Sequence, residues 1–186
     1  LTLQGHTNSV TACAWSPDGT RIVSGSDDTS LKVWDAATGT CRLTLQGHTN
    51  SVRACAWSPD GTRIVSGSWD TSLKVWDAAT GMCRLTLQGH TTSVTACAWS
   101  PDGTRIVSGS DDNSLKVWDA ATGECLSTGH QLPEHQTAAI DEQTGRVMSA
   151  SPEAWRWLGW MVTDPKTGEV RRLPIHAGGA YQETAE

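Results

Sequence analysis

The chain has 186 residues but no phenylalanine and only one tyrosine, although it contains ten tryptophans. It also lacks any cluster of lysine and arginine, and acidic residues outnumber basic ones by 20 to 14. This balance argues against nucleic-acid and anionic-membrane partners, which need concentrated positive charge. The sequence contains no run of about 18 apolar residues, so it predicts no membrane-spanning helix.

Several motifs that carry chemistry are missing as well. The six cysteines show no Cys-x-x-Cys spacing, so we expect no zinc site. Each cysteine lies among alternating apolar residues, which predicts buried free thiols and a cytoplasmic location rather than disulfides. His130 and His135 lie in a proline-containing loop and are a less favoured metal candidate. No Walker motif or protease signature is present, and we expect no cofactor and no metal.

What the chain does contain is a repeat of 42 residues. Residues 1–42 return as 43–84 and again as 85–126. The first two copies differ only at Thr11/Arg53, Asp27/Trp69 and Thr40/Met82. A period in this range indicates one supersecondary unit that buries its apolar face against the next copy.

Each repeat is predicted to form four short antiparallel strands. Turn residues such as Pro17, Asp18 and Gly19 separate the apolar segments. The first segment is continuously apolar and is expected to be buried on both faces, whereas the last alternates apolar and polar residues and is expected to be outermost. The four predicted strands of the first copy are Val10–Trp15, Arg21–Ser26, Ser30–Asp35 and Cys41–Gln46.

Each copy has Gly-His near its start and Trp-Asp near its end. These pairs are Gly5-His6 with Trp34-Asp35, Gly47-His48 with Trp76-Asp77, and Gly89-His90 with Trp118-Asp119. On these residues the chain resembles the WD-repeat β-propeller family, in its recently amplified bacterial form. The resemblance implies an all-β propeller of four-stranded antiparallel blades.

The segment 127–176 is interpreted as a degenerate fourth blade, followed by an irregular tail, 177–186. Its predicted strands are Gln136–Asp141, Arg146–Ser151, Trp155–Val162 and Val170–Ile175. The whole chain, 1–186, would then be one domain with four blades. Because propellers have about four to eight blades, we expect a homodimer to close an eight-bladed ring. At the junction, either Leu1–Gln4 or Val170–Ile175 would supply the outer strand.

Histidine, serine and aspartate recur together in each copy, and these are the residue types of a hydrolase triad. Three equivalent active sites in one small domain would be unusual, and no Gly-x-Ser-x-Gly turn accompanies them. The resemblance instead implies a structural hydrogen-bond network with no catalytic residue. Its members are His6, Ser24, Asp28 and Trp34, then His48, Ser66, Asp70 and Trp76, and finally His90, Ser108, Asp112 and Trp118.

Differences between the copies fall mainly in predicted loops. The resemblance places two of the variable positions on the face that usually contacts partners. Arg53 and Trp69 are residue types that dominate binding hot spots, but drift after duplication would also produce such differences. The candidate contact residues are Thr11, Asp27, Arg53, Trp69, Thr95 and Asp111.

The sequence therefore favours a non-catalytic module that binds a protein or peptide or senses a ligand. Because Leu1 begins in mid-pattern without a signal peptide, we expect the chain to be part of a larger protein, which the resemblance implies is a bacterial signalling protein. Two alternatives remain open. Trp69 could stack on a carbohydrate, or an enzyme site could lie in the central channel.

Overall fold

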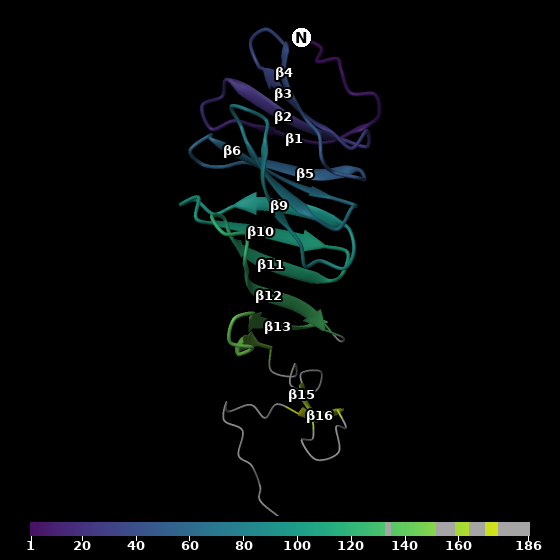
Figure 1. Ribbon diagram of the computed structural model, residues 1–186, viewed down its shortest axis with the longest axis vertical. Coiled ribbons are helices and arrows are strands. Elements are labelled where there is room, and N and C mark those ends of the chain that lie inside the picture. The colour runs from purple at the N-terminus through teal and green to yellow at the C-terminus, as the bar shows by residue number, and fades with distance from the viewer. Residues whose placement is uncertain (133–134, 152–158, 164–169, 175–186) are drawn as a thin grey trace, which may run out of the picture. The chain divides into compact units, whose positions relative to one another are not determined.

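The computed structural model describes residues 1–132, 135–151, 159–163 and 170–174. Sixteen β-strands run through these residues (Figure 1), which agrees with the predicted all-β class. The chain divides into two units, Leu1–Thr128 and Gly129–Glu186. Each unit is described separately below.

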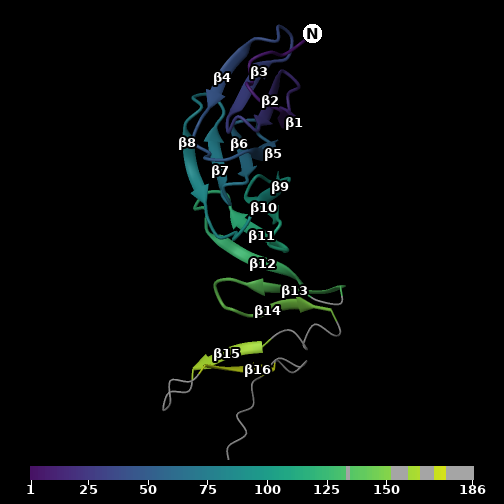
Figure 2. The same ribbon diagram turned by 90° about the vertical axis from the view of Figure 1, so that its right-hand side faces the viewer.

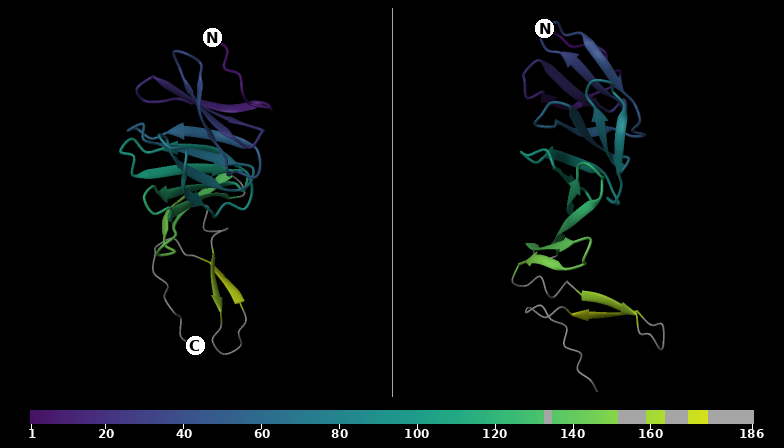
Figure 3. Two further views of the ribbon diagram at one scale, coloured as in Figure 1. Left: turned by 45° about the horizontal axis from the view of Figure 1, so that its top comes forward. Right: turned by 60° about the vertical axis from the view of Figure 1, so that its left-hand side comes forward.

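The unit Leu1–Thr128 is built from three blades, one for each repeat, that follow one another along the chain (Figure 3). Within a blade, neighbouring strands are antiparallel and hydrogen-bond in chain order. This order confirms the prediction for the repeat. Blade 1 comprises β1 (Val10–Trp15), β2 (Arg21–Ser26), β3 (Leu31–Asp35) and β4 (Cys41–Leu45). Blade 2 comprises β5 (Val52–Trp57), β6 (Arg63–Ser68), β7 (Leu73–Asp77) and β8 (Cys83–Leu87). Blade 3 comprises β9 (Val94–Trp99), β10 (Arg105–Ser110), β11 (Ser114–Asp119) and β12 (Cys125–Leu132).

Aspartate side chains hold the turns that connect the strands of a blade, as two of the three turns show. Between β1 and β2, the Asp18 carboxylate accepts hydrogen bonds from the Ser16 hydroxyl at 2.5 Å and the Thr20 amide at 3.0 Å. Between β3 and β4, the Asp35 carboxylate accepts one from the Thr38 amide at 2.8 Å, and Gly39 adopts a φ of 73°. Such short side-chain to backbone bonds explain why each strand ends where it does.

The core lies between blades rather than within one. Strands β1, β5 and β9 lie side by side, and β4 and β8 lie toward the opposite side of the unit (Figure 2). One apolar cluster joins Val23, Leu31 and Leu45 of blade 1 to Val52 and Trp57 of blade 2. A second cluster repeats this arrangement between blades 2 and 3. Each blade therefore depends on its neighbour to bury its apolar surface.

The first strand is an exception to the predicted burial. Val10 and Trp15 on β1 are 57% and 62% exposed, whereas the equivalent Val52 and Trp57 on β5 are 0% and 7% exposed. The expectation that Val10–Trp15 is buried on both faces is therefore wrong. The physical reason is that blade 1 covers β5, whereas no other blade among the described residues covers β1.

The cysteines were expected to be small buried side chains, and this is only partly correct. All six are free thiols, but Cys13 and Cys83 are exposed. Cys55 lies between two blades, where its thiol contacts the Val23 carbonyl at 3.9 Å. Burial raises the pKa of the Cys55 thiol to about 12, so this side chain is a protonated core group.

The unit Gly129–Glu186 contains two antiparallel hairpins in its described residues. β13 (Gln136–Asp141) pairs with β14 (Val147–Ala150), and β15 (Gly159–Thr163) pairs with β16 (Val170–Pro174). The two hairpins belong to different sheets, so their described strands do not form the single four-stranded fourth blade that we expected. Part of the predicted strand Trp155–Val162 and all of the tail 177–186 fall outside the described residues, as does Ile175.

The turn of the first hairpin also corrects the strand assignment. The Asp141 carboxylate accepts a hydrogen bond from the Thr144 amide at 2.7 Å, and Gly145 adopts a φ of 67°. This is the Asp-x-x-Thr-Gly turn found between β3 and β4, not the Pro-Asp-Gly turn between β1 and β2. By its turn, β13 therefore corresponds to a third strand, and the prediction that it replaces a first strand is wrong.

Candidate functional site

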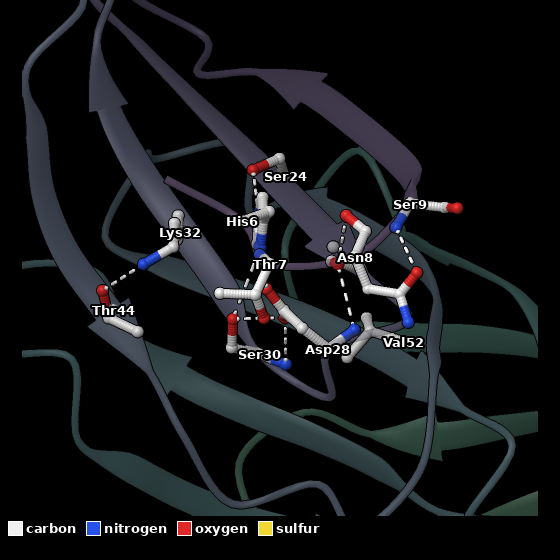
Figure 4. A network of polar contacts seen from close by, with 12 residues as sticks. His6, Thr7, Asn8, Ser9, Ser24, Asp28, Ser30, Lys32, Thr44 and Val52 are labelled. Atoms are coloured by element: carbon white, nitrogen blue, oxygen red, sulfur yellow. Dashed lines mark hydrogen bonds and ion pairs between the residues drawn. The ribbon is translucent and has the colours of Figure 1, made fainter. Parts of the chain in front are cut away.

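The repeated histidine, serine, aspartate and tryptophan meet at one end of each blade. In blade 1, His6 Nδ1 lies 2.8 Å from the Asp28 carboxylate, and His6 Nε2 lies 2.8 Å from the Ser24 hydroxyl (Figure 4). Trp34 Nε1 donates to the same hydroxyl at 2.8 Å. The network ties the segment before β1 to the strands β2 and β3 and to the turn between them.

The same network recurs in the other two blades with nearly identical distances. His48 contacts Asp70 and Ser66 at 2.7 Å each. In blade 3, the two histidine contacts and the tryptophan contact are all 2.8 Å. The structure thus brings together all twelve residues of the sequence-predicted network.

The direction of the hydrogen bonds follows from what each group can do. The Asp70 carboxylate only accepts, so His48 Nδ1 donates to it and the neutral ring accepts at Nε2. Ser66 then donates to His48 and accepts from the Trp76 indole N–H. Burial lowers the pKa of His48, which favours this neutral ring. Burial alone would raise the pKa of Asp70, but hydrogen bonds, from Ser72 above all, lower it to about 2.

This arrangement is unsuited to nucleophilic catalysis. Ser24, Ser66 and Ser108 are buried, although Ser24 also lines a hollow beside β1. Each hydroxyl also already donates to one group and accepts from another. A fully bonded buried network of this kind stabilises one conformation of a loop.

A second candidate site spans blades 1 and 2 and is exposed. Arg53 on β5 lies with its guanidinium carbon 4.5 Å from the centre of the Trp69 ring. Its Nη1 atom lies 3.3 Å from the Asp27 carboxylate of blade 1. Trp69 is 43% exposed. We call Asp27, Arg53 and Trp69 the Arg53 cluster.

The backbone presents these positions in the same way in every blade. The amide of Asp27 donates to the Ser9 carbonyl at 2.9 Å, and the amide of Trp69 donates to the Ser51 carbonyl at 2.9 Å. Asp111 repeats this bond in blade 3 at 3.0 Å. The scaffold therefore holds the residue at this position fixed, and only its side chain differs between blades.

Comparison with known proteins identifies the family. The family described as "WD domain, G-beta repeat" matches residues 1–35, 39–77 and 81–119, which is more than half of the chain. The chain belongs to this family. Repeats of this kind typically mediate protein–protein interactions.

Individual relatives share single WD repeats with this chain. The vegetative incompatibility protein HET-E-1 of Podospora anserina is 56% identical over 39 residues, which cover 21% of this chain and 3% of that protein. The mouse periodic tryptophan protein 2 homolog is 54% identical over 41 residues, 22% of this chain and 4% of that protein. These matches thus span a small fraction of the relatives' length.

A solved structure supports the propeller fold of the WD repeats. The crystal structure of RRP9 WD40 repeats superposes with a TM-score of 0.66 and 26% sequence identity. The match covers 78% of this chain and 48% of that chain. The sheets formed by the described residues, taken alone, do not close a ring.

Of the six predicted contact residues, the structure brings three together in the Arg53 cluster. Thr11 instead lies between blades 1 and 2, where its hydroxyl contacts the Val52 carbonyl. Thr95 and Asp111 are exposed on blade 3. The sequence therefore did not separate interblade residues from exposed ones, and partner contact at these positions stays a prediction.

Sequence reasoning missed the interblade role of one arginine in each of the first two WD repeats. Arg21 lies 4.5 Å from the centre of the Trp57 ring in the next blade, and Arg63 lies at the same distance from the Trp99 ring. Arg21 also donates to the Gly61 carbonyl at 3.0 Å. The available signal was the invariance of these arginines and tryptophans among the copies.

The described residues hold neither a helix long and apolar enough to cross a membrane nor a group of three or more side chains placed to bind a metal ion.

Proposed function

We propose that this chain is a non-catalytic interaction scaffold that binds a protein or peptide through the Arg53 cluster. The observation that carries the proposal is the contact of Arg53 with Asp27 and Trp69 across two blades. A large exposed aromatic beside an arginine matches the residue types of binding hot spots. Contacts on both sides of the guanidinium limit its freedom before binding, which reduces the entropy that a partner must overcome.

The comparison among the three WD repeats supports a specific role for blade 2. The position of Trp69 is aspartate in the other two copies, and the position of Arg53 is threonine. Both changes fall in one blade and their side chains contact each other. Paired substitutions that build one exposed cluster favour selection for binding over independent drift.

The test restores the residues of the first copy. Trp69→Asp and Arg53→Thr each introduce the side chain that is found at the equivalent position of blade 1. Met82→Thr is the matched control, because it removes the one other difference between the first two copies. Met82 is exposed and lies in a turn at the opposite end of the blade from the Arg53 cluster. Proteins captured from extract by the parent chain would be quantified for all three variants.

We expect Trp69→Asp and Arg53→Thr to lose the specifically captured proteins, and Met82→Thr to retain them. Retention of the same proteins by all variants would contradict the proposal. The carbohydrate alternative makes a different prediction. A glycan array would then show binding that depends on Trp69 with no protein partner present. For an enzyme with its site in the central channel, activity would not depend on the Arg53 cluster.

We further propose that a second copy of the chain contributes to a closed ring. The eight-bladed ring expected from the sequence requires residues 129–186 to form a full blade, whereas a ring of six uses only the three blades described. A larger bacterial signalling protein remains our proposal for the context, although the relatives named above are from eukaryotes. A cytoplasmic location is proposed from the six free thiols.

A further inference from the structure

The two ends of the blade stack leave two sheet faces with exposed apolar residues. The first face belongs to blade 1 and contains Val10 and Trp15 on β1. The last face belongs to blade 3 and contains Arg105 and Gly109 on β10, with Leu115 on β11. These faces are best understood from the interfaces that the chain already forms between its own blades.

The interface between blades 1 and 2 has a simple geometry. Val52 of blade 2 packs over Gly25 of blade 1, so closely that a Cβ atom on Gly25 would lie 2.7 Å from Val52 Cγ1. Arg21 of blade 1 stacks over Trp57 of blade 2 and donates to the Gly61 carbonyl. Glycine is required at position 25 because the Val52 side chain occupies the space that a Cβ atom would need.

The interface between blades 2 and 3 repeats this geometry. A Cβ atom on Gly67 would lie 2.6 Å from Val94 Cγ1. Arg63 stacks over Trp99 and donates to the Gly103 carbonyl at 3.0 Å. One interface is therefore built twice from the same residue types at the same repeat positions.

The last face carries one half of this interface without its counterpart among the described residues. Leu115 is 48% exposed, whereas the equivalent Leu31 and Leu73 are 0% exposed. Among the described residues, a Cβ atom on Gly109 would meet only Ala96, at 3.7 Å. No described residue therefore fills the space that valine fills at the two internal interfaces.

The first face carries the other half. Val10 and Trp15 are the equivalents of Val52 and Trp57, and both are exposed. A hollow of about 660 Å³ lies beside them and is also lined by Cys13. At the outer edge, Leu1 lies against Gly39, as Leu45 lies against Gly81. The start of the chain therefore occupies, at this edge, the place that the outer strand β4 takes at Gly81, and it leaves Val10 and Trp15 exposed. Packing of a second copy's blade 3 on this face requires the start of the chain to move aside for the outer strand of that blade.

We propose that the last face of one copy packs against the first face of a second copy of this chain. Val10 then fills the space over the partner copy's glycine at position 109, and Arg105 stacks over the tryptophan at position 15. The partner is a second copy because every chain carries both halves of an interface that it already forms twice internally. Two such junctions close a ring of six blades, within the range of about four to eight that propellers adopt.

This inference rests on the proposed pairing of two chains and adds the surfaces that join them. It differs from the eight-bladed ring, in which residues 129–186 would cover Gly109. It is independent of the Arg53 cluster, which lies at the loop end of the blades. Variants at Gly109 therefore test this interface without altering the proposed partner site.

The experiment measures the mass of the full chain in solution by light scattering. Gly109→Ala has room within one chain but places a methyl group where the second copy's valine would lie. Leu115→Asp alters the same face, and Val10→Asp alters the first face. Met82→Thr is the control, because Met82 lies outside both faces and is exposed. Circular dichroism verifies that each variant is folded.

We expect the parent chain and Met82→Thr to have twice the 19.9 kDa mass of the chain. The three face variants should show a twofold lower mass, that of a single chain. Mixing Val10→Asp with Gly109→Ala restores one intact junction, and therefore a pair. A monomeric parent chain would overturn both the pairing and the interface. A dimeric Gly109→Ala would overturn this interface alone and favour another blade at that position. A monomeric mixture would overturn the head-to-tail geometry.

Discussion

Arg53 of blade 2 reaches Asp27 of blade 1, with 3.3 Å between Nη1 and the carboxylate oxygen. The two residues are 26 positions apart in the sequence and belong to different repeats. Their contact makes the loop surfaces of two blades into one site. It also places the guanidinium beside the Trp69 ring.

This ion pair should contribute little to stability. A double-mutant cycle with Arg53→Thr and Asp27→Ala is expected to give a coupling free energy of about 0.5 kcal/mol, because both side chains are partly exposed to water. Urea unfolding measures each variant. The coupling should decrease as salt is added. A coupling that is zero at low salt would contradict the contact.

The buried network should matter much more. Ser66→Ala removes the group that donates to His48 and accepts from Trp76. Two buried polar groups are then left without this partner, and we expect a loss of about 2–4 kcal/mol in the free energy of unfolding. Ser9→Ala, at an exposed position, is the control and should be nearly neutral. Equal, small effects of both substitutions would show that the network is dispensable.

The same network predicts a dependence of stability on pH. The pKa of His48 lies below its ordinary value of 6.5 because of burial, so below pH 6.5 the unfolded chain binds a proton that the folded chain does not. Although burial opposes it, hydrogen bonding lowers the pKa of Asp70 from 3.8 to about 2. Between these values the unfolded chain again binds more protons. Stability should therefore fall on acidification in both windows.

Urea unfolding at a series of pH values measures this dependence. Asp70→Asn removes the carboxylate and should flatten the loss of stability between pH 3.8 and about 2. The variant should also be less stable at neutral pH, because a charged acceptor of several hydrogen bonds is lost. An unchanged acid profile in Asp70→Asn would mean that other carboxylates govern acid unfolding.

Glycine at the blade interface gives a further prediction. Gly67→Ala places a Cβ atom 2.6 Å from Val94 Cγ1, so the blades must move apart, at a cost of about 1–3 kcal/mol. Gly109→Ala occupies the equivalent position without this clash inside one chain. Thermal unfolding in dilute solution should therefore show a clear loss only for Gly67→Ala. Similar losses would indicate an effect of strand glycine itself.

Much of the fold could be predicted from the 42-residue repeat. Apolar segments and turn residues such as Asp18 and Gly19 act locally, so the strands of each blade and their antiparallel order follow from neighbouring residues. The network of His48, Ser66 and Asp70 was predictable from the resemblance to the WD-repeat family, whose motif residues recur in each copy. The hairpin of β13 was assigned to the wrong strand because its turn chemistry was compared with the wrong turn.

The sequence by itself thus determined the repeat and the strands, because these depend on local patterns and on identical copies. It indicated the buried polar network through the resemblance to the WD-repeat family. Only the tertiary structure decided which faces are covered. Val10 and Val52 are the same residue in the same local sequence, yet one is exposed and the other is buried. The difference comes from whether another blade packs against the strand, and that contact joins residues far apart in the chain.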